Sequence, residues 1–173
     1  MWGLSPNLAI IFQVDARTGQ LLGSNFFGPG MSDIAADRSR VWESDVTGSI
    51  TPYTSLALRS PLFHDFHTDV IHDSVAVPGA DAIAVGREDI WVLDEAKSRI
   101  FPVDRSTHDV GAAIQVPVGA MDVVAGGQFV WVANASSISW ISQTTHLVTT
   151  TSLPGLVSGI ATTDMRGGGH GRV

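Results

Sequence analysis

The sequence contains no cysteine, a single lysine and only three glutamates among its 173 residues. The absence of cysteine excludes disulfides and thiolate metal sites. No apolar run approaches the ~18 residues that a membrane-spanning helix needs. The nine arginines and the lysine form no cluster, so the chain lacks the basic surface that binds nucleic-acid phosphates. We therefore expect no membrane span and no nucleic-acid partner.

The sequence also shows no secretory signal peptide. The apolar stretch LAIIF, residues 8–12, is shorter than a signal-peptide core, and no basic segment precedes it. The compartment therefore stays unassigned, and a secreted or extracytoplasmic location follows only for a longer exported parent chain.

What the chain does contain fits a folded domain with many turns. Hydrophobic residues make up 44% of it, which is enough apolar material for a buried core. The 18 glycines and 8 prolines are spread along the chain, as in folds of short elements joined by tight turns. Fourteen aspartates against three glutamates, within a net charge of −7, also favour turns over helix interiors.

An internal repeat organises the sequence. Four tryptophans recur at intervals of 40, 49 and 40 residues, namely Trp2, Trp42, Trp91 and Trp131. A glycine stands twelve residues before each of the last three, namely Gly30, Gly79 and Gly119. IFQVDARTG (11–19) matches IFPVDRSTH (100–108), each beginning nine residues after its tryptophan. We expect one domain over 1–164, with repeats at about 2–41, 42–90, 91–130 and 131–164 and a flexible glycine-rich tail at 165–173.

Each repeat predicts four short strands. In FVWVAN (129–134), alternate side chains point to opposite faces, and both faces are apolar. A sheet that is buried on both faces must be stacked between two others, which is the situation of a β-propeller blade. Strands are predicted at 34–37, 41–44, 83–86, 90–93, 99–103, 123–126, 129–133 and 139–142, with essentially no helix outside 56–73. The fold class is therefore all-β, a propeller of four-stranded antiparallel blades with about four blades present.

The repeated residues also have predicted places in the blades. The tryptophans are expected to fill the space between adjacent blades. Asp15 is expected to accept backbone N–H bonds in its turn, and Gly19, His108 and His146 occupy a position of positive φ. Three residues that each follow a tryptophan by three positions are expected to close the next turn, namely Asp45, Asp94 and Asn134.

The segments GADAIAVGREDIWVLDEAKSRIFPVDRSTH and GAMDVVAGGQFVWVANASSISWISQTTH resemble the bacterial YVTN/NHL-type propeller repeats, including the streptogramin lyase-like (virginiamycin B lyase-like) group. The resemblance covers about residues 2 to 164 and implies a propeller scaffold. The resemblance implies about six to eight blades, within the range of propellers in general, so four repeats imply an open arc or partial propeller. The exposed end blades would then favour self-association, unless the chain is a piece of a longer protein.

The resemblance also implies an alternative function, a divalent-cation-dependent lyase or hydrolase. The His/Glu constellation of those lyases matches no motif of this sequence, so no catalytic residue is assigned. The expected function is instead a binding or interaction module, which takes a protein or a small polar ligand at loops around the channel mouth.

A column of aspartates forms the candidate ligand site. Asp33 and Asp122 lie nine residues before their tryptophans and Asp81 lies ten before, where a propeller lines its channel mouth. Asp45 and Asp94 are expected on the same rim. These side chains either form a negative mouth that attracts cationic or polar ligands, or serve as turn caps that were inherited with the repeat.

Two further features complete the candidates. The long second repeat contains HDFHTDVIHD, where His64, His67 and His72 could hold a divalent cation, although a solvated loop is the favoured interpretation and no cofactor is expected. Trp140 stands where the preceding repeat has Pro102, outside the tryptophan series. It is a candidate contact residue.

Overall fold

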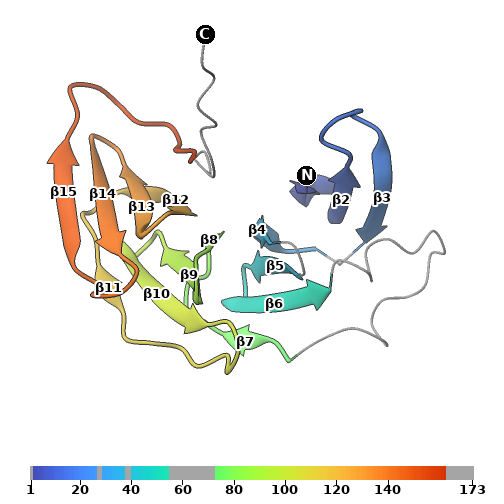
Figure 1. Cartoon of the computed structure of the whole chain (residues 1–173), viewed down its shortest axis with the longest axis horizontal. Coiled ribbons are helices and arrows are strands. Elements are labelled where there is room, and N and C mark those ends of the chain that lie inside the picture. The colour runs from blue at the N-terminus through green and yellow to red at the C-terminus, as the bar shows by residue number, and fades with distance from the viewer. Residues whose placement is uncertain (1, 27–28, 38–39, 55–72, 163–173) are drawn as a thin grey trace, which may run out of the picture.

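The computed structural model describes residues 2–26, 29–37, 40–54 and 73–162. Within these residues the chain is all-β, apart from the short 3-10 helix η1 (Pro6–Leu8). Four antiparallel sheets follow one another along an open arc (Figure 1). This confirms the predicted fold class. No helix in the described part of the chain is long and apolar enough to cross a membrane.

Strands stand in chain order within every sheet. The first sheet contains β1 (Trp2–Ser5), β2 (Ile10–Val14) and β3 (Leu21–Phe26). The second contains β4 (Met31–Ala36), β5 (Arg40–Asp45), β6 (Ser49–Thr54) and β7 (Val75–Ala76). The third contains β8 (Ala82–Val85), β9 (Asp89–Asp94), β10 (Arg99–Asp104) and β11 (Ile114–Gln115). The fourth contains β12 (Ala120–Gly126), β13 (Phe129–Asn134), β14 (Ser137–Ser142) and β15 (Val148–Ser152). All eight predicted strands are confirmed, with ends shifted by at most three residues.

The first strands of the three four-stranded sheets line the inside of the arc. β8 contacts β4 on one side and β12 on the other, while the later strands of each sheet fan outward (Figure 1). The first and last sheets stand at opposite ends of the arc. This arrangement is that of propeller blades in a ring that is not closed.

The sheets are out of phase with the tryptophan-to-tryptophan repeat. Each four-stranded sheet begins with the strand before its tryptophan, so that Trp42, Trp91 and Trp131 lie in second strands. Trp2 lies in β1, and β2 carries the sequence that matches β10. The three-stranded sheet therefore corresponds to the second, third and fourth strands of a blade.

Trp42 and Trp91 fill the spaces between blades, as predicted, whereas Trp131, in the last described sheet, is only half-buried. Trp42 and Trp91 are fully buried. The core around Trp42 draws on the second and third sheets and includes Ile50, Val75, Val77, Ile83, Ile90, Val92, Phe101 and Val103. The core around Trp91 joins the third and fourth sheets and includes Leu93, Ile100, Val123, Val130, Val132 and Ile141.

A histidine from the following blade packs against each buried tryptophan. The ring centroids of Trp42 and His108 are 5.6 Å apart, and those of Trp91 and His146 are 5.4 Å apart, both edge to face. His108 and His146 adopt φ of 64° and 58°, and Gly19 adopts 73° at the same place in the first sheet. The predicted positive φ is confirmed at all three.

Candidate functional site

Asp33 stands where the second sheet begins, at one end of the inner strands. A register shift between Met31 and Asp33 marks a bulge in β4, and bulges redirect side chains at the rims of sheets. One carboxylate oxygen of Asp33 accepts the N–H of Ile34 at 2.7 Å. The other accepts the N–H of Ile83, in the next sheet, at 2.9 Å. One carboxylate thus ties two blades together through their backbones.

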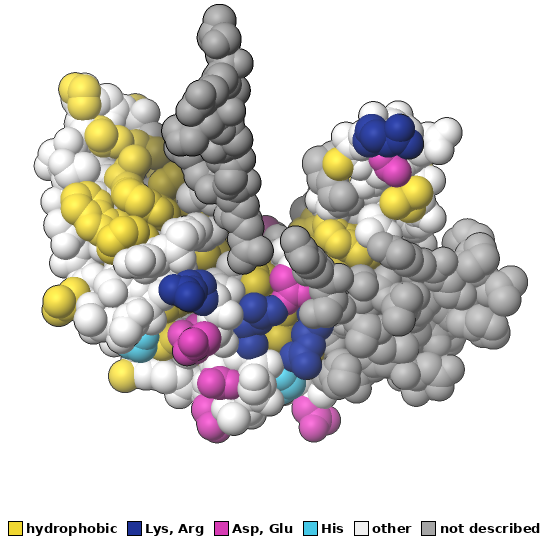
Figure 2. Space-filling view, viewed as in Figure 1, with side chains coloured by type: hydrophobic (Ala, Val, Ile, Leu, Met, Phe, Trp, Pro, Cys, Tyr) yellow, Lys and Arg dark blue, Asp and Glu magenta, His cyan; other side chains and the backbone are white. Residues whose placement is uncertain are grey.

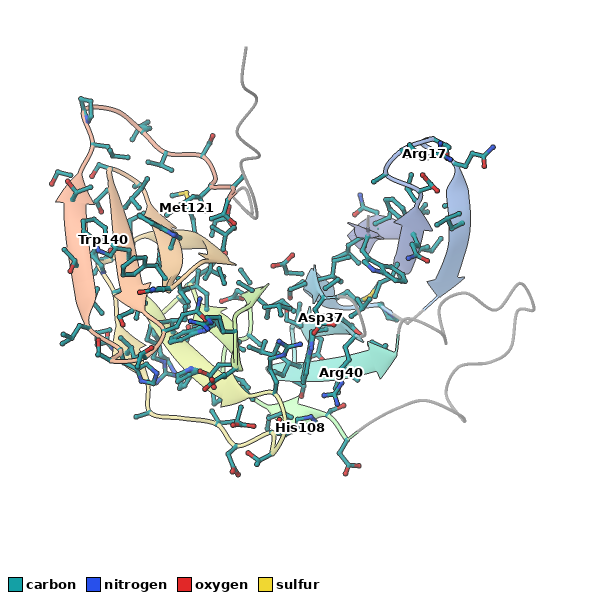
Figure 3. All side chains as sticks on the ribbon, viewed as in Figure 1. Arg17, Asp37, Arg40, His108, Met121 and Trp140 are labelled. Carbon is teal, nitrogen blue, oxygen red and sulfur yellow. The ribbon has the colours of Figure 1, made fainter. Side chains whose placement is uncertain are left out.

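Asp122 repeats this arrangement in the fourth sheet. A register shift between Ala120 and Asp122 places a bulge at Met121, which Figure 3 labels. The carboxylate of Asp122 accepts the N–H of Val123 at 2.8 Å and that of Ile160 at 2.9 Å. Ile160 belongs to the segment that follows the last sheet.

The third sheet has no aspartate in this position. Ala82 stands there, and the N–H of the following residue, Ile83, is the group that Asp33 binds. Gly159 stands in the same place before Ile160, which is bound by Asp122. Asp33 therefore binds its own blade and the following one, and Asp122 binds its own blade and the segment that follows the last sheet. The displaced Asp81 has another role, since it accepts the N–H of Glu95 at 2.9 Å.

Charge accumulates at this end of the inner strands. Burial raises the pKa of Asp33, and the charge of Asp122 adds to that effect. Burial also raises the pKa of Glu95, together with the charges of Asp81, Asp122 and Asp33. The four carboxylates, hereafter the acidic mouth (Asp33, Asp81, Glu95 and Asp122), therefore lie within one another's electrostatic field. Glu95 was missed from the sequence, where the only signal was its place directly after Asp94.

Asp45 and Asp94 lie at the same edge, because the ends of β5 and β9 pair with the beginnings of β4 and β8. Both carboxylates are engaged locally. Asp45 accepts the N–H of Thr47 at 2.7 Å, as predicted for a turn cap. Asp94, only 2% exposed, accepts the N–H of Lys97 at 3.0 Å and forms an ion pair with Arg99 at 2.8 Å.

The turn-closing prediction was wrong for Asn134. Its side-chain amide donates to the hydroxyl of Ser139 at 3.3 Å and so reaches across to β14. The turn after β13 contains only two residues, Ala135 and Ser136, before the next strand begins. A turn this short leaves few free amides for a side chain to cap.

Metal binding has no support in the part of the chain that the structure describes. No group of three or more His, Asp and Glu side chains among those residues is arranged to hold an ion. His64, His67 and His72 lie outside the described residues, and their metal site stays a prediction.

At the opposite end of the inner strands, Lys and Arg side chains lie among Asp and Glu side chains (Figure 2). A polar hollow of about 450 Å³ is lined there by Arg40, Arg87, Glu88, Asp104, Arg105 and Ser106. The guanidinium of Arg105 pairs with Asp37 of the preceding sheet, and Arg40 donates to the carbonyl of Arg105 at 3.0 Å. Figure 3 labels Asp37 and Arg40. Sequence reasoning missed this contact, because it joins turns of two blades that are 68 residues apart.

Trp140 lies in β14 of the last sheet, where Figure 3 labels it, and it is half-buried. It pairs with Trp131 across the strands, and their ring centroids are 5.8 Å apart. Phe129 packs on the other side of Trp131 at 6.0 Å and is 37% exposed. Trp140 is thus one member of a partly exposed aromatic cluster (Phe129, Trp131 and Trp140).

No protein-family model matches the chain, and no curated protein matches it. Among solved structures it is similar to BamB from Moraxella catarrhalis, with a TM-score of 0.64 and 9% identity over 90% of this chain and 48% of that one. The hydrazine synthase of Kuenenia stuttgartiensis gives 0.62 and 16%, over 76% of this chain and 38% of that one. The computationally designed protein Ika4 gives 0.61 and 11%, over 85% and 89%.

These likenesses place the chain in the β-propeller class of folds. At such low identities they show the fold alone, and the specific repeat group suggested by the sequence stays a resemblance. The chain spans less than half the length of the two natural proteins named above.

Proposed function

We propose that this chain is a binding module whose acidic mouth receives a cationic group, carried by a protein partner or a small polar ligand. The convergence of four carboxylates from three blades at one end of the inner strands carries the proposal. Backbone N–H groups hold Asp33 and Asp122 in fixed positions, so their charges are oriented before a ligand arrives. Fixed charges of one sign attract and orient an oppositely charged partner.

Glu95 offers the sharpest test of this function. Its side chain lies at the exposed rim, and only its backbone N–H takes part in the hydrogen bond to Asp81. Glu95→Gln therefore removes one charge of the mouth and leaves the aspartate bridges in place. Glu88→Gln is a matched control, because Glu88 is also exposed and lines the hollow at the opposite end of the strands.

The measurement is calorimetric titration with spermine and with a short oligolysine peptide. We expect Glu95→Gln to weaken binding by up to about five-fold, since an exposed charge pair contributes about 0.2–1 kcal/mol. Added salt should weaken binding to the wild-type protein. If Glu88→Gln weakens binding equally, or if neither variant nor added salt changes the affinity, the acidic mouth is not the binding surface.

A further inference from the structure

Among the described residues, the first sheet has no counterpart of the strand that begins every other blade. β1 carries Trp2 in the second-strand position, and its described neighbour in the sheet is β2 alone. In the third sheet, the corresponding strand β9 also pairs with β8 along its other edge. An edge strand presents unpaired N–H and C=O groups that another strand can bind. The first sheet therefore has a place for one more strand.

A segment near the other end of the described chain has the sequence pattern of such a strand. SGIATT (158–163) repeats the pattern of the inner strands β4, β8 and β12. Its described part already lies beside β12, where the N–H of Ile160 binds Asp122 and the hydroxyl of Thr162 donates to the carbonyl of Ala125 at 3.3 Å. Residues 158–162 nevertheless belong to no sheet in the described structure. They occupy the place of a first strand, and no further strand of a blade stands beside them among the described residues.

The two end faces are also halves of the interface that is repeated inside the molecule. Trp42 and Trp91 are fully covered by the next blade, whereas the equivalent Trp131 is only half-buried. On the first sheet, Phe12 and Val14 are half-buried. Their equivalents in the third sheet, Phe101 and Val103, are covered by the preceding blade. Each end face thus exposes apolar side chains that a neighbouring blade covers at the equivalent positions inside the molecule.

Side-chain size matches these two ends to each other in particular. Beside Trp42 and Trp91 stand prolines, Pro52 and Pro102, and a histidine of the next blade fills the remaining space. Beside Trp131 stands the much larger Trp140. The first sheet, in turn, has Gly19 in place of that histidine, with nothing within 4 Å of the position of a Cβ. The large ring of Trp140 at one end would therefore face the free space beside Gly19 at the other.

We propose that two copies of this chain close into one ring, in which residues 158–162 of each copy become the missing first strand of the other copy's first sheet. A second copy is required because the first sheet of the same copy stands at the far end of the arc (Figure 1). The contact is made twice around a two-fold axis, so it closes without leaving a free end. The exposed hydrophobic side chains over the last sheet (Figure 2) are then covered.

The repeat fixes the register of the added strand. In the third sheet Ala82 pairs with Leu93, and Ile83 pairs with Val92. By the same spacing, Gly159 of one copy lies opposite Leu4 of the other, and Ile160 lies opposite Gly3. Directly opposed residues in antiparallel strands have Cα atoms about 4.5–5.5 Å apart, which a disulfide can bridge.

This register leads to a cross-linking experiment. Leu4→Cys is made in one chain and Gly159→Cys in another, and the two chains have tags of different length. The protein has no cysteine of its own. After mixing and mild oxidation, we expect a disulfide-linked heterodimer that reductant separates. Val46→Cys, on an exposed turn in the middle of the arc, replaces Gly159→Cys as the control and should give none. No cross-link between folded variants, or a doubly substituted chain that links only within itself, overturns the proposal.

A second measurement does not depend on cysteine chemistry. Light scattering on the 173-residue chain should give the mass of two 18.3 kDa chains. Phe129→Asp places a charge on the exposed aromatic cluster and should yield a folded monomer by circular dichroism, whereas Val46→Asp should remain a dimer. A monomeric wild-type chain, a larger assembly, or a Phe129→Asp dimer would each overturn the two-copy ring.

Discussion

The bridge made by Asp33 gives a quantitative test of how the blades are held together. Asp33→Ala removes the acceptor of two backbone N–H groups, those of Ile34 and Ile83. Ile83 is only 3% exposed, so water cannot replace the lost carboxylate there. A buried donor without a partner costs about 1–3 kcal/mol. Removing the partly buried carboxylate returns part of this cost, because burial disfavours its ionised form. We therefore expect the net loss of unfolding free energy to lie in the lower half of this range, at about 1–2 kcal/mol.

Denaturant unfolding followed by tryptophan fluorescence measures this loss, and amide hydrogen exchange locates it. The N–H of Ile83 should exchange much faster in Asp33→Ala. Asp122→Ala is the matched variant, because Asp122 makes the same pair of bonds with Val123 and Ile160. In that variant the exchange of Ile83 should stay slow. An unchanged exchange rate for Ile83 in Asp33→Ala would refute the bridge.

The pH dependence of the unfolding free energy tests the surroundings of Asp33 in a second way. The pKa of Asp33 is raised above its ordinary value of 3.8, so the folded state binds the proton more readily than the unfolded state. Ionisation of Asp33 therefore opposes folding at pH values above its folded pKa, and this opposition is lost as the pH falls toward 3.8. The destabilisation caused by Asp33→Ala should accordingly grow as the pH falls through this window. A constant difference between the two proteins would contradict the assignment.

Three further predictions concern the core, the turns and the histidine-rich segment. Trp42→Ala should cost about 3–5 kcal/mol of unfolding free energy, because Trp42 is a buried aromatic residue. Trp131→Ala, measured on the monomeric Phe129→Asp background, should cost roughly half as much, because the Trp131 ring is half-exposed. Equal losses for the two variants would contradict the open end of the arc. His108→Gly should lose only the contact with Trp42, which is worth about 0.5–1.5 kcal/mol. His108→Ala loses the same contact and also places an alanine at the positive φ of residue 108, so it should be the less stable variant in the same unfolding assay. Zinc and nickel should leave the melting temperature unchanged, and a rise that His67→Ala removes would instead establish a metal site.

Much of this fold could be predicted because its signals are local. In FVWVAN, alternation over six residues identifies a strand that is apolar on both faces, and the interval between Trp91 and Trp131 repeats the unit. The positive φ of His108 and His146 followed from alignment with Gly19, since a turn is specified by a few adjacent residues. Such features do not depend on how the blades are placed in space.

The site was less accessible because its decisive contacts join different blades. The sequence places Asp33 and Asp122 at the same interval before a tryptophan, but Ala82 interrupts the series without explanation. Only the structure shows that Asp33 binds the N–H that follows Ala82. The pairing of Arg105 with Asp37 escaped prediction for the same reason, since neither turn contains a signal for the other.

Asp122 would connect the acidic mouth to the closure of the two-copy ring. The bond from Asp122 to Ile160 would lie at the junction between copies, so the bridge that ties internal blades would also support the ring. Closing the ring brings two acidic mouths to one channel, where their charges repel each other and oppose association. A polycation bound at the mouth relieves this repulsion and binds the closed ring better than the open arc. By linkage, spermine should therefore tighten the association of two copies, and added salt should do so when spermine is absent. Association that salt weakens throughout would mean that the two mouths do not face one channel, and at least one of the proposals would then be wrong.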